Sequence, residues 1–174
     1  MCYFESITFN DSDGSFSEHF QSIEKIVRKI ELPLTKLSES KANGGKEYLD
    51  TNRVNKQFQE LLGEVNWYQQ KEFSLGQSLE KFDFYKNKIR LEVQFGADVA
   101  ASENVHNSDL YFRKGKLDAL ILIVRCHDVP ADSRVVSYKW IRNRIEQHQK
   151  VERIKIPIWL IGLYEANKSW LMKK

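Results

Sequence analysis

A continuous apolar run, Leu117 to Cys126, places the strongest constraint on the fold of this chain. Its length and β-branched content are typical of a strand buried on both faces, because a strand with one solvated face would alternate apolar and polar residues. A second run, Ile156 to Tyr164, has the same character, and Pro157 indicates that a strand begins there or lies at a sheet edge. Strands of this kind need covering layers on both sides of their sheet, and helices supply such layers.

Helices that can cover the sheet are predicted in three places. The first spans Ser15 to Leu32, where Ser15 and Glu18 fit a capping box. The second spans Val54 to Val65, and the third spans Ser133 to Gln149. Apolar residues at three- and four-residue steps indicate one buried face in each: Phe16, Phe20, Ile23, Val27 and Ile30; then Phe58, Leu61 and Leu62; then Tyr138, Ile141 and Ile145. The charges on the other face of the third helix are either solvated or close to a polyanion: Lys139, Arg142 and Arg144.

The segment from Asp83 to Phe95 is predicted to be a short hairpin. Its outgoing strand alternates, with Ile89, Leu91, Val93 and Phe95 on one face and Arg90, Glu92 and Gln94 on the other. With a two-residue turn at Lys86 and Asn87, Asp83 pairs with Arg90, and Glu92 is its diagonal neighbour, roughly 7–8 Å away at the backbone. Two carboxylates so placed can share a small hard cation such as Mg2+, which keeps several waters. The alternative is that Asp83 only caps or solvates the turn.

Two polar segments are predicted to be loops. Leu37 to Arg53 contains a Gly-Gly break flanked by lysines and could approach phosphates through backbone amides, but it lacks the spacing of a Walker motif. Gly96 to Asp109 is small and polar and holds Asn104, His106 and Asn107. Short amide side chains are groups that contact base edges in DNA, although they are also ordinary constituents of loops.

Composition limits the other possibilities. The chain has 174 residues and a formal net charge of +3, so we expect one domain over residues 1–174 and a charge compatible with nucleic-acid binding. Cys2 and Cys126 form no zinc-binding pattern. No apolar run approaches the length of a membrane span, and the N-terminus lacks the features of a secretion signal, so we expect a cytoplasmic protein. The predicted fold class is α/β, a mixed central sheet flanked by helices.

The pattern D-x8-E-x-Q, formed by Asp83, Glu92 and Gln94, resembles that of the BglII-like branch of type II restriction endonucleases, within the larger PD-(D/E)xK nuclease superfamily. Most of that superfamily carries a lysine where Gln94 stands. The stretch LEVQF, the Asn/Ser-rich segment after it, the strand through Ile123, the turn at residues 129–131 and the late strand PIWLIGLYE are similar in order and spacing. Pro33, the loop at residues 41–45 and residues 50–52 are similar more loosely. The resemblance covers about residues 18–166.

The resemblance implies a Mg2+-dependent homodimer that cuts double-stranded DNA at a short specific sequence. Asp83 and Glu92 would hold the metal with the backbone carbonyl of Val93, and Gln94 would replace the usual lysine. A neutral glutamine can orient the attacking water but cannot deprotonate it, so we expect a steep dependence on Mg2+.

The resemblance also implies that bases are contacted from residues 96–107 and residues 131–134. In these segments, the residues that we expect to contact bases are Asn104, Asn107, Ser133 and Arg134. The chain is shorter than typical members, so we expect it to lack some C-terminal elements used for DNA contacts or dimerisation.

Three alternatives remain open at this point. The first is a structure-selective or repair nuclease of the same fold, and the second is a catalytically silent DNA-binding relative. Retention of both Asp83 and Glu92 disfavours the silent relative. The third is an unrelated α/β domain without DNA affinity at low salt, where phosphate contacts are strongest.

Overall fold

The computed structural model describes residues 2–12, 14, 16–36, 47–75, 78–96, 98–126, 137–151 and 153–164. The elements in chain order are β1 (Tyr3–Phe9), α1 (Phe20–Lys29), β2 (Leu34–Lys36), β3 (Glu47–Leu49), α2 (Thr51–Glu64), β4 (Tyr68–Leu75), β5 (Ser78–Lys86), β6 (Ile89–Val93), α3 (Asp98–Arg113), β7 (Ala119–Arg125), α4 (Tyr138–Gln149) and β8 (Ile158–Tyr164).

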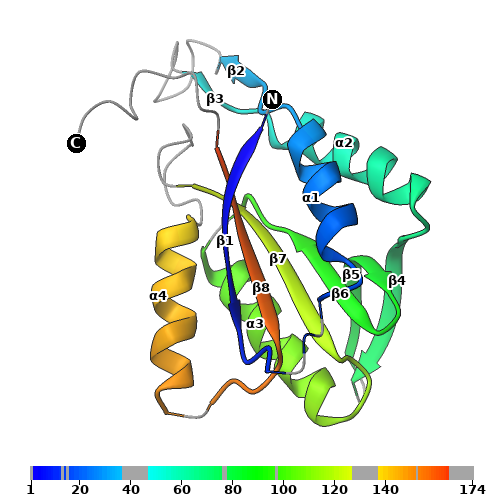
Figure 1. Ribbon diagram of the computed structural model, residues 1–174, viewed down its shortest axis with the longest axis vertical. Helices are drawn as coiled ribbons and strands as arrows, with labels where there is room; N and C mark the ends of the chain where they lie inside the picture. Colours follow the sequence, from blue (N-terminus) through cyan, green and yellow to red (C-terminus); the bar gives the residue numbers. More distant parts are fainter. Residues whose placement is uncertain are drawn as a thin grey trace.

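Six strands form one mixed sheet in the order β1-β8-β7-β6-β5-β4 (Figure 1). The central strands β6, β7 and β8 are parallel to one another. The outer pairs, β1 with β8, β5 with β6 and β4 with β5, are antiparallel. A separate small sheet joins β2 and β3. The predicted fold class, a mixed central sheet flanked by helices, is confirmed.

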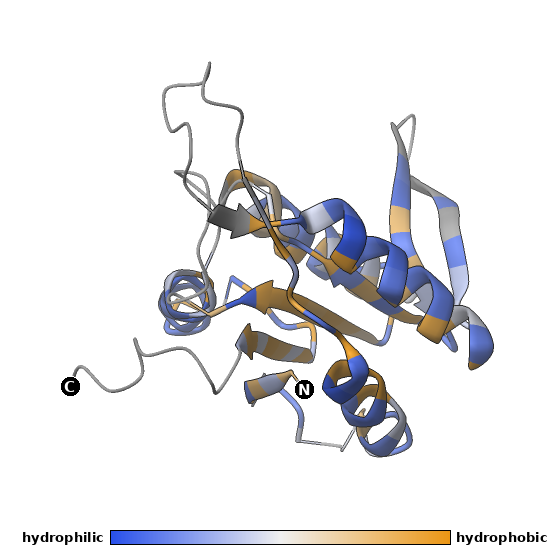
Figure 2. Ribbon diagram, turned by 90° about the horizontal axis from the view of Figure 1, so that it is seen from above, coloured by the Kyte–Doolittle hydropathy of each residue, from blue (hydrophilic) through white to orange (hydrophobic). Residues whose placement is uncertain are grey.

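Two apolar cores lie on opposite faces of the sheet. In β7, Ile121 and Ile123 belong to one core, whereas Leu120 and Leu122 belong to the other, as alternation along a strand requires. The first core includes buried residues of α1 and α2, and the second includes those of α3 and α4. Figure 1 shows α1 in front of the sheet and α3 behind it. Figure 2 shows the central strands as largely hydrophobic and the helices as mixed in character.

The two apolar runs form central strands, as predicted. Every residue of β7 is buried, and β8 lies between β1 and β7. Pro157 precedes β8, and its carbonyl accepts the N–H of Leu120 at 2.9 Å. Of the two interpretations of Pro157, the start of a strand is therefore correct and the sheet edge is wrong.

The first two predicted helices exist with different limits. α1 begins at Phe20 and not at Ser15, and its N-cap is His19, which makes no side-chain capping bond. Ser15, the first member of the predicted capping box, lies outside the described residues. α2 begins at Thr51 because Asp50 caps it, accepting the N–H of Arg53 at 3.2 Å. The predicted loop from Leu37 to Arg53 therefore extended too far: residues 47–49 form β3, and residues 37–46, with the Gly-Gly break, lie outside the described residues.

The third predicted helix also begins later than expected. α4 starts at Tyr138 and not at Ser133, because Ser137 has extended backbone angles and caps the helix by accepting the N–H of Trp140. Its buried face carries Tyr138, Ile141 and Ile145, as predicted.

The prediction of a loop from Gly96 to Asp109 is wrong. α3 spans Asp98–Arg113 and connects the parallel strands β6 and β7. Parallel neighbours need a long crossover connection, which is usually a helix, and this topological demand outweighs the polar composition of the segment.

Among the described residues, no helix is long and apolar enough to cross a membrane.

Candidate active site

The turn between β5 and β6 sets the register of the site. Tyr85 pairs with Arg90 and Lys86 pairs with Ile89, so the two turn residues are Asn87 and Lys88. Both have positive φ angles, 48° and 60°, as the favoured tight hairpin turn requires. The predicted turn at Lys86 and Asn87 is wrong by one residue, and the predicted pairing of Asp83 with Arg90 is therefore wrong by two. Continuation of the observed register brings Asp83 level with Glu92.

The alternation of β5 is interrupted at Asp83. Phe82 and Phe84 are two residues apart and would share one face of a regular strand. Instead, Phe82 lies in the core that includes α3 and α4, and Phe84 lies in the core that includes α1 and α2. Asp83 itself is exposed, and its Oδ2 accepts the backbone N–H of Val93 at 3.1 Å. This contact ties the Asp83 carboxylate to the end of β6.

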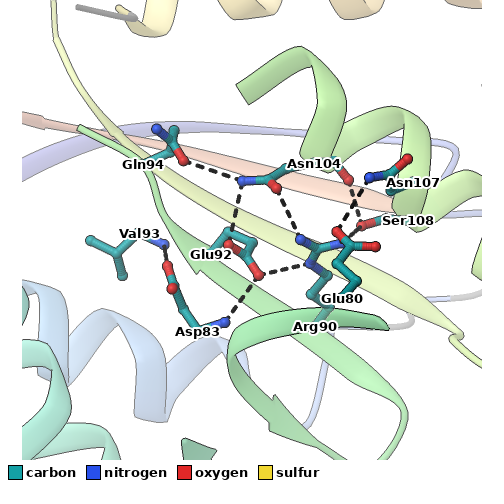
Figure 3. Close-up of polar contacts among 9 residues, drawn as sticks. All are labelled: Glu80, Asp83, Arg90, Glu92, Val93, Gln94, Asn104, Asn107 and Ser108. Carbon is teal, nitrogen blue, oxygen red and sulfur yellow. Dashed lines mark hydrogen bonds and ion pairs between the residues drawn. The ribbon is translucent and has the colours of Figure 1, made fainter. Parts of the chain in front are cut away.

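Glu92 is buried beside Asp83, with 4% of its surface exposed. Its Oε1 accepts the Nε–H of Arg90 at 2.8 Å and the backbone N–H of Asp83 at 3.1 Å, and its Oε2 accepts from Asn104 Nδ2 at 3.3 Å (Figure 3). Burial raises the pKa of Glu92 to about 7, and the charge of Asp83 adds to this, although Arg90 opposes both. A cation near the two carboxylates would favour the ionised form of Glu92 and so oppose this rise in its pKa.

Gln94 follows Glu92 on the same face and is half-buried. Its backbone N–H donates to the carbonyl of Ile123 at 2.8 Å, which anchors the residue beside β7. Its side-chain Oε1 accepts from Asn104 Nδ2 at 3.3 Å. The structure thus brings Asp83, Glu92 and Gln94 together just beyond the point where the pairing of β5 with β6 ends.

A buried arginine that the sequence analysis did not single out supports this arrangement. Arg90 is 1% exposed, and its NH1 lies 2.8 Å from Glu80 Oε1. Its guanidinium also donates to Ser108 Oγ and lies over the ring of Phe82, 4.1 Å from the centroid. Because helices cover this strand, a charged side chain two positions before Glu92 must be buried and therefore needs partners. This requirement is the signal by which Arg90 could have been found from the sequence.

The predicted DNA-contacting residues fall into two groups. Asn104 and Asn107 lie on α3, where Asn104 bonds Glu92 and Gln94, and Asn107 Nδ2 donates to Glu80 Oε1 at 3.4 Å. Ser133 and Arg134 lie outside the described residues. Base contact by any of the four stays a prediction.

The donors at this site fit a small hard cation. Asp83 and Glu92 are carboxylates, and such cations accept two carboxylates with a backbone carbonyl and waters. In the part of the chain that the structure describes, no group of three or more His, Cys, Asp or Glu side chains is placed to hold a metal. A small cavity of about 50 Å3 beside Asp83 is lined by three amide side chains, those of Asn55, Gln59 and Gln69, together with the apolar residues Phe84 and Val93.

Several solved structures match this chain in fold, among them two of restriction endonuclease BglII. The crystal structure of restriction endonuclease BglII complexed with a DNA 16-mer has a TM-score of 0.87 and 21% identity, covering 96% of this chain and 78% of that one. The crystal structure of free BglII has a TM-score of 0.73 and 20% identity, covering 96% of this chain and 82% of that one. Because both identities are low, these matches establish the fold alone.

Sequence comparison identifies the family. A search of curated protein sequences finds no match. Residues 11–163 match the restriction endonuclease BglII/BglIII family, which covers both predicted carboxylates, Gln94 and all of the large sheet except the N-terminal strand and the last residue of β8. The chain therefore belongs to the restriction endonuclease BglII/BglIII family and is a type II sequence-specific DNA endonuclease.

Proposed function

We propose that this enzyme hydrolyses a phosphodiester bond in each strand of double-stranded DNA, with Mg2+ held by Asp83, Glu92 and the backbone carbonyl of Val93. One observation carries the proposal. Glu92 accepts the N–H of Asp83, and Asp83 accepts the N–H of Val93, so the three proposed ligands are linked to one another at the end of one hairpin. Restriction endonucleases generally use a divalent metal ion, and the choice of Mg2+ rests on the all-oxygen donor set.

Each residue has a defined part in the proposed reaction. A bound Mg2+ lowers the pKa of a water ligand and neutralises charge on the phosphate. Asp83 and Glu92 provide the negative charge that binds it, and Arg90 orients Glu92 through Oε1. Gln94 is neutral at every physiological pH and therefore orients the attacking water without deprotonating it.

The partners follow from the same proposal. BglII forms a complex with a DNA 16-mer. We propose that this chain likewise binds double-stranded DNA, as a cytoplasmic homodimer. Asn104, Asn107, Ser133 and Arg134 are our proposed base contacts. For Asn104 the amide already has partners within the protein, so a base contact there would require it to share or exchange them.

Cleavage of unmethylated plasmid or phage DNA tests the proposal. Incubation with Mg2+ is expected to give discrete fragments, and incubation with EDTA is expected to give none. Asp83→Asn and Glu92→Gln are expected to abolish cleavage while circular dichroism shows an intact fold. A smear in place of fragments would contradict sequence specificity, and DNA binding without any cleavage would contradict catalysis.

Gln94→Ala is expected to reduce cleavage less than Glu92→Ala, because Gln94 only orients water whereas Glu92 holds the metal. Single-turnover rates at several Mg2+ concentrations provide the measurement. Equal loss in two variants that are both folded would contradict the orienting role.

A further inference from the structure

We propose that Asn104 is a positioning residue that fixes the orientation of the Gln94 amide, so that Gln94 directs its Nε2–H groups, and not its oxygen, toward the reacting water and phosphate. This inference rests on the proposed function. It assigns Asn104 a role in the reaction that is separate from the base contact predicted for it. A chain of hydrogen bonds, whose direction Arg90 fixes at one end, connects Arg90 through Asn104 to Gln94 (Figure 3).

Arg90 fixes the orientation of Asn104. A guanidinium carries only donors, so the atom of Asn104 that faces it must be the oxygen. Arg90 NH2 donates to Asn104 Oδ1 at 2.9 Å. The backbone of Asn104 is held as well, because its carbonyl accepts from Ser108 Oγ at 2.7 Å, and that hydroxyl accepts from Arg90 NH1. Asn104 Nδ2 is therefore left to face β6.

Asn104 in turn fixes the orientation of Gln94. Its Nδ2 donates to Glu92 Oε2 and to Gln94 Oε1, both at 3.3 Å. One side chain on α3 thus contacts all three polar residues of the β6 face and its extension: Arg90, Glu92 and Gln94. Because the Gln94 oxygen is turned toward Asn104, its amide nitrogen points the other way. The orientation of an amide is decided by such a network.

Gly96 leaves room for this nitrogen. A Cβ atom built on Gly96 would lie 2.8 Å from Gln94 Nε2, closer than such atoms approach in proteins. The absence of a side chain at residue 96 therefore leaves space for the Gln94 amide in this position. An N–H donor there can bind a phosphate oxygen, which an amide oxygen in the same place would repel, whereas water can bind either end of an amide.

Two variants of Asn104 separate this role from a structural one. Asn104→Asp has the same shape and keeps an acceptor for Arg90, but it cannot donate to Gln94 Oε1, so the Gln94 amide turns over and presents its oxygen. Asn104→Ala leaves the amide free in both orientations. We expect Asn104→Asp to lower the single-turnover cleavage rate at saturating Mg2+ about 10- to 100-fold, and Asn104→Ala to lower it less. Loss of the contact with Arg90 alone predicts the reverse order, because alanine lacks the acceptor, and repulsion between the new carboxylate and Glu92 Oε2 is separated by the measurements that follow.

A double-mutant cycle with Gln94→Ala gives the second test. Without the Gln94 amide there is nothing left to orient, so Asn104→Asp is expected to add less than about threefold in that background. Losses that multiply would overturn the proposal and indicate an effect through Glu92. Calorimetric titration with Ca2+ alone, on each variant, reports any such effect on metal binding directly.

Side-chain amide exchange measured by NMR provides a readout without cleavage. The Gln94 resonances, identified by their loss in Gln94→Ala, are expected to exchange fast in the unaltered protein and more slowly in Asn104→Asp, where they bond the new carboxylate. Unchanged exchange would overturn the proposal. If the unaltered enzyme does not cleave DNA with Mg2+, the proposed function fails, whereas the exchange measurement still decides the orientation of Gln94.

Discussion

Arg90 illustrates how one buried charge connects stability to the active site. It lies between Glu80 and Glu92 and contacts Asn104 and Ser108 on α3. A buried charge that loses its partner is costly, because the remaining charge cannot be solvated. The arginine therefore holds together a strand and a helix whose polar faces would otherwise be poorly suited to burial.

Arg90→Met is expected to reduce the free energy of unfolding by about 3–5 kcal/mol, because Glu92 then remains buried without its cation. Urea unfolding followed by circular dichroism provides the measurement. Arg142→Met is the matched control, since Arg142 makes an ion pair on the exposed face of α4, and a change within about 0.5 kcal/mol is expected there. Similar losses in the two variants would contradict the importance of burial at residue 90.

At this scale the sequence indicated candidate site residues but not the residues that contact them. Asp83 and Glu92 could be singled out because their spacing on a hairpin is local, Gln94 was singled out by the family resemblance, and the roles of all three stay proposals. Arg90 was assigned to the correct face, but its partners Glu80, Asn104 and Ser108 come from other elements. Contacts between elements depend on how α3 packs on the sheet, which local spacing does not contain.

At the scale of elements, the β5–β6 turn carries a local strain that can be measured. Lys88 has a φ angle of 60°, a conformation that glycine adopts without cost and that other residues adopt at about 1–2 kcal/mol. Asn87 precedes it, and Asn-Gly is a favoured pair for this turn.

Lys88→Gly is therefore expected to stabilise the protein by about 1 kcal/mol, measured by urea unfolding. Lys88→Ala is the control, because it removes the same exposed ion pair with Asp118 but keeps a Cβ atom. A gain in the alanine variant equal to that of the glycine variant would show that backbone strain is not the cause.

The connection between α3 and β8 depends on Asp109. Its Oδ1 accepts the backbone N–H groups of Lys155 and Ile156, and its Oδ2 accepts from Arg113. Burial acts to raise the pKa of Asp109, but these hydrogen bonds and the charge of Arg113 outweigh it, so the pKa lies below its usual value. The ionised form is thus favoured in the folded protein.

Asp109→Asn is expected to lower the free energy of unfolding by about 2 kcal/mol at neutral pH. Because the folded pKa is the lower one, this contribution is fully present above the unfolded pKa of about 4 and is lost as the pH falls through the folded value. The difference between the two proteins, from urea unfolding at several pH values, should therefore be constant above about pH 5 and shrink below pH 4. A constant difference down to pH 2 would contradict this account.

Elements were predictable where their pattern was local and strong. The runs that form β7 and β8 and the apolar stripes of α1, α2 and α4 all gave the correct type. α3 was missed because its buried positions include Ser108 and Asp109, polar residues that satisfy their bonds across the fold and break the apolar stripe. The demand for a helix came from the parallel pairing of β6 with β7, which is a property of the whole sheet.

At the scale of the whole molecule, the sheet places one pair of carboxylates, the proposed metal ligands, in each chain. Asp83 and Glu92 both come from the β5–β6 hairpin, so a single chain supplies one proposed site. The strands of a DNA duplex run in opposite directions, and two-fold symmetry of a protein dimer matches that of a palindromic site. We therefore expect each chain of the proposed homodimer to cut one strand.

Mixed dimers test this division of labour. Unaltered protein and an excess of Glu92→Gln, allowed to exchange subunits, are expected to form dimers with one competent site, because the substitution removes a metal ligand without changing the shape of the chain. Supercoiled plasmid with a single recognition site should then accumulate as nicked circles, whereas the unaltered dimer should give linear product. Agarose electrophoresis of samples taken during the reaction separates the two forms. Subunit exchange must first be demonstrated. If the proportion of linear product then stays unchanged and nicked circles do not increase, one site cuts both strands.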